Sequence, residues 1–220
     1  TIGIIGGTGS GKSTLVNLIP RFYDVSEGAV LIDGQDVRSL PLDDLRQSVG
    51  IVMQKAVLFQ GTIYDNILWG NEDATEEEVI QALKDAQAWE FVSAKEQGIY
   101  TKVEQGGRNL SGGQKQRICI ARALLKKPAV LILDDSTSAV DTATDAKIRA
   151  AFQKCIPGTT KIIIAQRVSS VQDADRIVVL DDGKINGVGT HDELVANNEI
   201  YRDIYESQTK DGGDVDRPQN

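Results

Sequence analysis

The chain alternates short, continuous apolar runs with longer segments in which apolar residues recur once per helical turn. The continuous runs lie at residues 2–5, 49–53, 130–133 and, after the charged Lys161, at residues 162–165. Such runs are typical of strands buried on both faces of a parallel sheet, whereas apolar residues spaced three or four apart predict amphipathic helices. The alternation of the two patterns predicts an α/β fold with a mainly parallel sheet.

One long stretch between the second and third apolar runs carries the helical pattern. Thr75 and Glu78 have the spacing of a capping box, and from Val79 onward apolar positions recur once per turn. We therefore expect an inserted helical segment here. The aromatic residues that flank it, including Trp69 and Trp89, are expected to be packing residues.

Turn signals predict two antiparallel regions. Residues 29–32 run into the pair Asp33-Gly34, which predicts a strand entering a tight turn, although its sheet partner is not obvious downstream. A second such pair, Asp182-Gly183, predicts a hairpin over residues 176–187.

Composition excludes several classes of protein. The 220 residues are 40 % hydrophobic and 25 % charged, as in a globular protein large enough to bury a full core. The net charge of −8 offers no basic surface for nucleic acid, so neither DNA nor RNA is an expected partner. No apolar run is long enough to cross a bilayer. Cys119 and Cys155 form neither a metal motif nor a disulfide framework, and we interpret both as small core residues.

The strongest motif follows the first apolar run. Residues 6–13 read Gly-Gly-Thr-Gly-Ser-Gly-Lys-Ser, which fits G-x-x-x-x-G-K-[ST] between a predicted strand and a predicted helix. The glycines let successive backbone N–H groups point at phosphate oxygens, Lys12 is expected to reach the β- and γ-phosphates, and the Ser13 hydroxyl is expected to hold Mg²⁺. The motif predicts binding of ATP or GTP. The candidate phosphate-binding residues are Gly7, Thr8, Gly9, Ser10, Gly11, Lys12, Ser13 and Thr14.

A second helix start also suits an anion. Ser111 and Gln114 have the spacing of a capping box, and Gly112 and Gly113 between them leave the first backbone N–H groups unobstructed. These four residues therefore predict a second phosphate-facing helix end, which need not face the same nucleotide as the first.

Polar residues stand directly after three of the predicted strands. Asp134 and Asp135 follow the run at 130–133, where acidic residues commonly manage Mg²⁺ and water. Gln54 and Gln166 follow two other runs. We expect Gln54 to lie beside the nucleotide, with a solvated loop glutamine as the alternative.

With these motifs assembled, the chain resembles the nucleotide-binding domain of ATP-binding cassette (ABC) transporters over nearly its whole length. The phosphate loop, Gln54, the signature Leu110-Ser-Gly-Gly-Gln114, Asp134 and Gln166 occur in the family's order. The stretches 59–67 and 189–194 are similar to exporters rather than importers. Relatives that repair DNA separate the two phosphate motifs by a long coiled coil, which this sequence lacks.

The resemblance implies a domain layout. The ATP-binding domain would span residues 1–208, with a P-loop core at about 1–61 and 119–208 and an α-helical subdomain at about 62–118. The polar residues 209–220 are expected to be disordered.

The resemblance also assigns roles. Asp135, Gln166 and Gln54 would be the catalytic residues, and Ser13, Gln54 and, through water, Asp134 would hold Mg²⁺. In the family two such domains bind two ATP molecules head to tail, so that the signature residues 111–114 would act on the partner's ATP. Closure moves attached transmembrane domains, which would contact residues 54–61 and 104–107 at the cytoplasmic face of the cell membrane.

Two positions depart from the family's pattern. The usual Glu after the catalytic strand is Asp135 here, one methylene shorter, and the usual switch His is Gln166. We interpret the chain as the slow, degenerate half of a heterodimeric exporter, because positioning supplies most of the rate in phosphoryl transfer. The alternative is a self-sufficient ATPase in a homodimer, with Asp135 as its base.

A third departure concerns the start of the sequence. Family members carry strands and an adenine-stacking aromatic residue upstream of the phosphate loop, and this sequence begins too late to include them. We therefore expect weaker nucleotide affinity and a partial antiparallel region with an unpaired edge at residues 29–32.

Overall fold

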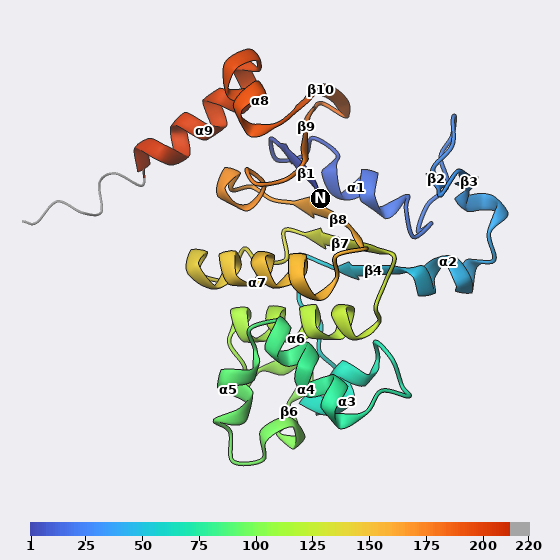
Figure 1. Cartoon of the computed structure of the whole chain (residues 1–220), viewed down its shortest axis with the longest axis vertical. Helices are drawn as coiled ribbons and strands as arrows, with labels where there is room; N and C mark the ends of the chain where they lie inside the picture. The colour runs from blue at the N-terminus through green and yellow to red at the C-terminus, as the bar shows by residue number, and fades with distance from the viewer. Residues whose placement is uncertain (212–220) are drawn as a thin grey trace, which may run out of the picture. The chain divides into compact units, whose positions relative to one another are not determined.

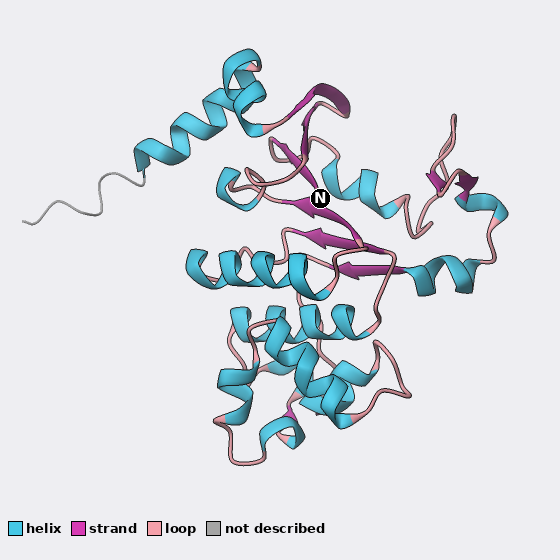
Figure 2. Ribbon diagram, in the orientation of Figure 1, coloured by secondary structure: helices cyan, strands magenta, loops and turns pink. Residues whose placement is uncertain are grey.

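The computed structural model describes residues 1–211 and divides into two compact units. The first unit combines Thr1–Asn17 with the chain from Ile162 onward, and the second is Leu18–Lys161. Both have the α/β character that the hydrophobic pattern predicts, with parallel strands and flanking helices (Figures 1 and 2).

The strands of the first unit are mainly parallel. β1 (Ile2–Gly6) lies between β8 (Thr160–Ile164) and β9 (Arg176–Asp181) and is parallel to both. β10 (Lys184–Gly189) returns antiparallel to β9, which confirms the predicted hairpin. The middle of β1 is buried, as expected for a strand with neighbours on both edges. The start of the loop that follows β1 is therefore fixed in position by the two neighbouring strands.

Short helices complete the first unit. α1 (Lys12–Asn17) follows the β1 loop, and the 3₁₀ helix η4 (Val168–Ser170) follows β8. α8 (His191–Asn197) begins with a capping box, and α9 (Glu199–Asp211) ends the described part of the chain. The helix thus includes the first three residues of the expected tail, and the rest of that tail lies outside the described residues.

The second unit pairs two parallel strands. β4 (Val49–Val52) lies parallel to β7 (Val130–Asp134). The helix α2 (Leu42–Ser48) directly precedes β4. α7 (Thr142–Cys155) begins at Asp141, whose carboxylate accepts a hydrogen bond from the Thr144 N–H at 2.9 Å. That bond holds the pKa of Asp141 below its ordinary value.

The two cysteines have different environments. Cys119 is buried, as predicted, but Cys155 is exposed, so the interpretation of both as core residues is wrong for Cys155. Cys155 is the last residue of α7, where the buried face has already ended at Phe152. A thiol at this end of the helix has no core to enter.

Helices fill the rest of the second unit. α3 (Ile63–Leu68) and α4 (Glu76–Asp85) pack on α6 (Gly112–Leu125), and α5 (Trp89–Ser93) packs on α4. α6 buries most of its second half because it has neighbours on several sides. The expected capping box of Thr75 and Glu78 opens α4.

Small elements connect the helices of the second unit. β5 (Gly61–Thr62) pairs with β6 (Lys102–Val103), and single 3₁₀ turns lie at Val37–Ser39, Gly98–Tyr100 and Gln105–Gly107. These elements set the ends of the helices that they join.

The predicted strand at residues 29–32 shrinks to β2 (Leu31–Ile32). Its partner is β3 (Gln35–Asp36), which follows at once through a turn with Asp33 and Gly34 at φ 49° and 78°. Positive φ at both central residues is what a two-residue hairpin of this kind requires. The partner that the sequence did not reveal is therefore the next residue pair along the chain.

Candidate nucleotide-binding site

The phosphate loop of the first unit is organised by its lysine. The Lys12 ammonium donates hydrogen bonds to the backbone carbonyls of Gly6 and Gly7, both at 2.8 Å, and to Ser10 Oγ at 3.3 Å. Lys12 opens helix α1, and the two carbonyls belong to the end of β1 and the residue after it. The ammonium is therefore fixed against the loop backbone, where the motif places phosphate oxygens.

Glycine is required at several positions of this loop. A Cβ on Gly6 would lie 2.1 Å from the Leu180 carbonyl oxygen, which excludes any side chain there. Gly9 and Gly11 have φ values of 80° and 94°, in the left-handed region that favours glycine. A Cβ on Gly7 or Gly9 would meet no atom within 4 Å, so this side of the loop is open.

The donor set fits a nucleotide phosphate with Mg²⁺. The open side of the loop combines exposed backbone at Gly7, Thr8 and Gly9 with a lysine ammonium. The hydroxyl residues Ser13 and Thr14 are exposed at the start of α1. Backbone N–H groups and an ammonium suit an anion, and a hydroxyl oxygen suits Mg²⁺.

The loop after β8 carries Gln166, the predicted switch residue. Ala165 and Val168 are buried, whereas Gln166 between them is exposed. The backbone of this loop is held from α9: Gln208 Nε2 donates to the Gln166 carbonyl at 2.7 Å, and Gln208 Oε1 accepts from the Val168 N–H at 2.8 Å. Nothing in the sequence pattern singled out Gln208, because it lies in a polar, exposed stretch.

The end of β7 joins two of the predicted site residues in the second unit. Gln54 Nε2 donates to Asp135 Oδ2 at 3.0 Å, so these residues meet although they are 81 positions apart. Gln54 is exposed, and this hydrogen bond turns its side-chain amide toward Asp135. Asp134 is only 8 % exposed, and Asp135 has φ 46°, a left-handed conformation that Asp tolerates better than most residues.

The start of α6 has the capping box that the sequence predicts. Ser111 Oγ accepts from the Gln114 N–H at 3.2 Å, and Gln114 Oε1 accepts from the Ser111 N–H at 3.0 Å. Gly113 has an additional role, because a Cβ there would lie 2.8 Å from the Ala139 carbonyl oxygen. The glycines therefore also let the segment after β7 pass close to this helix end.

Gln116 joins three of these elements and was missed by the sequence analysis. Its Nε2 donates to the Gln54 carbonyl at 3.3 Å, and its Oε1 accepts from the Ala139 N–H at 3.2 Å. Gln116 is 3 % exposed, on the face of α6 that also buries Cys119. A polar residue on a buried helix face was the signal that could have revealed it.

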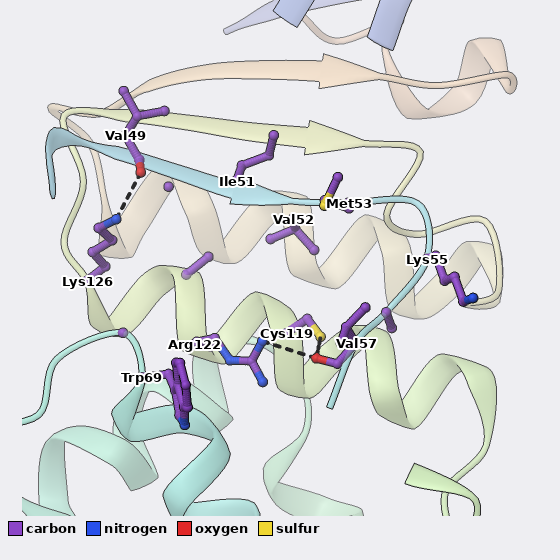
Figure 3. Close-up of a pocket in the computed structure, with 14 residues that line it drawn as sticks. Val49, Ile51, Val52, Met53, Lys55, Val57, Trp69, Cys119, Arg122 and Lys126 are labelled. Atoms are coloured by element: carbon purple, nitrogen blue, oxygen red, sulfur yellow. Dashed lines mark hydrogen bonds between the residues drawn. The ribbon is translucent and has the colours of Figure 1, made fainter. Parts of the chain in front are cut away.

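An apolar pocket lies between β4 and α6 (Figure 3). Arg122 Nη1 and Cys119 Sγ both donate to the Val57 carbonyl, at 3.2 Å and 3.7 Å, and so fix the segment that follows β4. Burial raises the pKa of the Cys119 thiol and lowers the pKa of the Arg122 guanidinium. Cys119 therefore stays protonated and serves packing rather than nucleophilic chemistry.

Trp69 at this pocket differs from the expectation that it packs in the core. It is 67 % exposed and stacks on Phe59, with ring centroids 4.7 Å apart. Phe59 is itself 43 % exposed. The prediction for Trp69 is wrong because the helix before it, α3, buries its other face against α6.

The described residues contain no helix that is both long and apolar enough to cross a bilayer. Groups of three or more His, Cys, Asp or Glu side chains arranged to hold a metal ion are likewise absent from residues 1–211. The candidate Mg²⁺ residues form no such group, since only Asp134 among them is acidic.

Comparisons with known proteins place these features in a family. The family model described as ABC transporter matches residues 1–138. Two curated relatives are the uncharacterized ABC transporter ATP-binding protein YfiB of Bacillus subtilis, 48 % identical over 208 residues, and an ATP-dependent lipid A-core flippase of Methylobacillus flagellatus, 45 % identical over 208 residues. Each alignment covers 94 % of this chain and 36 % of the relative.

A solved structure of a bacterial Atm1-family ABC exporter with ATP bound has the same fold. Its TM-score is 0.91 at 41 % sequence identity, over 94 % of this chain and 36 % of the exporter chain. The sequence presented here thus spans about a third of the length of these relatives. The family match, the mainly parallel α/β fold and the phosphate loop agree, and the chain therefore belongs to the ABC transporter family and matches the ATP-binding part of its exporters.

Proposed function

We propose that this chain binds MgATP and drives export, as the ATP-binding part of an ABC exporter at the cytoplasmic face of a membrane. The observation that carries the proposal is the phosphate loop, with Lys12 held on the Gly6 and Gly7 carbonyls and an open side for the phosphates. The relatives' names support it, since they describe ATP-binding and ATP-dependent transport proteins.

The site residues take the roles that the family pattern assigns. Lys12 and the loop backbone bind the β- and γ-phosphates, and Ser13, Gln54 and Asp134 hold Mg²⁺, the last through water. Asp135 orients the attacking water, and Gln166 contacts the γ-phosphate. Ser111, Gly112, Gly113 and Gln114 act in trans, on the ATP of a second domain, where backbone N–H groups stabilise developing charge.

The nucleotide proposal is tested on the intact protein with a lysine variant. Lys12→Ala should weaken MgATP binding by at least about tenfold, because a hydrogen bond from a charged group contributes about 1.5–3 kcal/mol. The matched control is Lys102→Ala, which removes an exposed lysine from β6. Equal affinities of the two variants, measured by calorimetric titration, would overturn the proposal.

We also propose that the chain's own site turns over slowly and that its partner is a different ATP-binding chain. Asp135 is one methylene shorter than the usual glutamate, and a displacement of about 1 Å can cost on the order of 10²-fold in rate. Gln166 also lacks the imidazole of the usual histidine. The domain would then contribute residues 111–114 to a faster partner site.

A self-sufficient ATPase in a homodimer remains the second candidate function, because Gln54 holds the Asp135 carboxylate in place at 3.0 Å. Two variants separate the two candidates in single-turnover hydrolysis. If the site is degenerate, Asp135→Glu with Gln166→His raises the rate at this site and Asp135→Asn hardly changes it. If Asp135 is an adequate base, Asp135→Asn abolishes turnover.

The transmembrane part of the exporter is the proposed occupant of the apolar pocket beside β4. Met53 and Trp69 line this pocket and are 49 % and 67 % exposed, and Val57 in the same wall is 49 % exposed (Figure 3). The part of the relatives that this chain does not span would cover such a surface. Trp69→Ala in the intact transporter should leave ATP binding intact and lower transport, whereas unchanged transport would overturn this assignment.

A further inference from the structure

The C-terminal helix reaches back to the loop that follows β8. Gln208 lies in α9, 42 residues after Gln166 and 40 after Val168, and its side-chain amide binds both. Nε2 donates to the Gln166 carbonyl at 2.7 Å, while Oε1 accepts from the Val168 N–H at 2.8 Å. One amide thus satisfies a donor and an acceptor two residues apart in the same loop.

We propose that Gln208 is a positioning residue, which fixes the switch loop so that Gln166 is presented to the γ-phosphate. The inference rests on the proposed function, since it concerns how Gln166 is held for that reaction. We call the pair of hydrogen bonds made by Gln208 the C-terminal clamp. Gln208 itself acts through the backbone of the loop.

The loop needs the C-terminal clamp because its buried residues lie on either side of Gln166 and do not hold Gln166 itself. Ala165 and Val168 are 5 % and 2 % exposed, so apolar burial holds the chain before and after Gln166. The exposed residue between them gains no such burial. Two short hydrogen bonds from a neighbouring helix fix the carbonyl of Gln166 and the N–H of Val168, and therefore the turn between them.

α9 is well placed to hold the clamp rigidly. Tyr201 near its start is fully buried, its N–H donates to Asn198 Oδ1 at 2.9 Å, and its hydroxyl lies 2.8 Å from His191 Nδ1. Gln208 follows two helical turns later, about 10 Å along the axis. α9 also packs on η4, the short helix of the switch loop (Figure 1). The buried start of α9, at Tyr201, thus fixes the position of Gln208 near the other end of the helix.

The first arm of the test measures hydrogen exchange at the Val168 amide of the intact protein. Gln208→Ala should speed that exchange about tenfold, because both hydrogen bonds are lost. Gln208→Glu places a carboxylate oxygen against the Gln166 carbonyl oxygen, and because two acceptors repel each other this variant should also speed the exchange. The matched control is Ser207→Ala, which removes only a hydroxyl bonded to the Ile204 carbonyl within α9.

The second arm measures ATP hydrolysis at this chain's own site with the same variants, in single-turnover experiments that give the saturating rate (kcat) and the ATP concentration at half of that rate (KM). Gln208→Ala and Gln208→Glu should lower kcat several-fold with little change in KM, because both lose the bond to the Gln166 carbonyl while the phosphate loop is untouched. Ser207→Ala should match the wild type. Rescue of kcat by Gln208→Asn is not expected, since the shorter side chain cannot span both partners.

The outcomes separate the clamp from the proposed function. If the wild-type protein binds no MgATP, the proposed function is wrong. The positioning role of Gln208 is then wrong as well, even if Gln208→Ala speeds hydrogen exchange at Val168. Active protein in which Gln208→Ala leaves both Val168 exchange and kcat within twofold of wild type overturns the clamp alone. Faster exchange with unchanged kcat shows a structural contact that does not position Gln166, and this also overturns the proposal.

Discussion

Each unit has a glutamine whose side-chain amide holds a loop by hydrogen bonds to its backbone. One of these glutamines is buried and the other is exposed. Gln116 in α6 and Gln208 in α9 each donate through Nε2 to the backbone carbonyl of a predicted catalytic glutamine, Gln54 in one unit and Gln166 in the other. Each accepts, through Oε1, a backbone N–H of the chain nearby. Gln116 is 3 % exposed, whereas Gln208 is exposed.

The difference lies in what each clamp connects. Gln116 binds two segments far apart in sequence, at Gln54 and Ala139, from the second turn of α6. Gln208 binds two neighbouring positions of one loop from a helix near the surface. A buried clamp of this kind ties the site to the stability of the fold, while an exposed clamp affects the loop with little consequence for folding.

Substitution of the buried glutamine should have the largest effect. Gln116→Leu leaves the Gln54 carbonyl and the Ala139 N–H without this partner, and the loss of two part-buried hydrogen bonds costs roughly 1–3 kcal/mol in total. We therefore expect the free energy of unfolding to fall by roughly 1–3 kcal/mol in urea denaturation. Gln81→Leu, at an exposed glutamine on α4, is the control. A loss no larger than that of the control would refute the importance of the buried clamp.

Displacement of one partner of Gln116 should have an intermediate effect. Gly113→Ala places a Cβ 2.8 Å from the Ala139 carbonyl, which must move, and overpacking of this kind costs about 1–3 kcal/mol. Gly112→Ala is the matched control, because its Cβ meets only the Ala139 Cβ at 3.4 Å. Thermal unfolding should separate the two variants by several degrees, and equal melting temperatures would contradict the predicted contact.

Removal of the cap that begins α6 should cost less. Ser111→Ala loses the hydrogen bond from the Gln114 N–H, and the loss of such a cap costs about 1 kcal/mol. Hydrogen exchange should rise in the first turn of α6 and much less at its buried second half, where tertiary packing holds the helix. Ser93→Ala, at an exposed serine near the end of α5, serves as the control. Uniform exchange along α6 would argue against a local cap.

The exposed clamp should show the smallest effect on stability. Gln208→Ala is expected to change the free energy of unfolding by less than about 0.5 kcal/mol, as for most surface substitutions. Comparison with Gln116→Leu in the same urea series measures the contrast directly. A loss as large as that of Gln116→Leu would show that α9 contributes to global folding and would remove the distinction between the two clamps.

Local signals in the sequence carried much of the fold. The capping pairs at Thr75 and Ser111 and the turn at Asp182-Gly183 all appear as expected. Each depends on groups within a few residues of one another, so the sequence alone states the whole interaction. The phosphate loop is also a local signal, because its whole motif lies within residues 6–13.

The misplaced residues share a different cause. Trp69 and Cys155 were expected in the interior because of their residue types, and both are exposed. Whether an apolar side chain is covered depends on which element packs against its helix, and one-turn spacing does not state the partner. β3 was missed for a different reason, because a strand of two residues is too short to show an alternating pattern.

The sequence by itself determined the elements, their caps, the phosphate-binding motif and the order of the motifs, because these depend on neighbouring residues and backbone conformation. Only the tertiary structure decided that Gln54 meets Asp135, that Gly113 leaves room for the Ala139 carbonyl, and that Gln116 and Gln208 hold the loops. These contacts join residues tens of positions apart. Their partners are selected by the packing of the strands and helices that carry them, which no local pattern encodes.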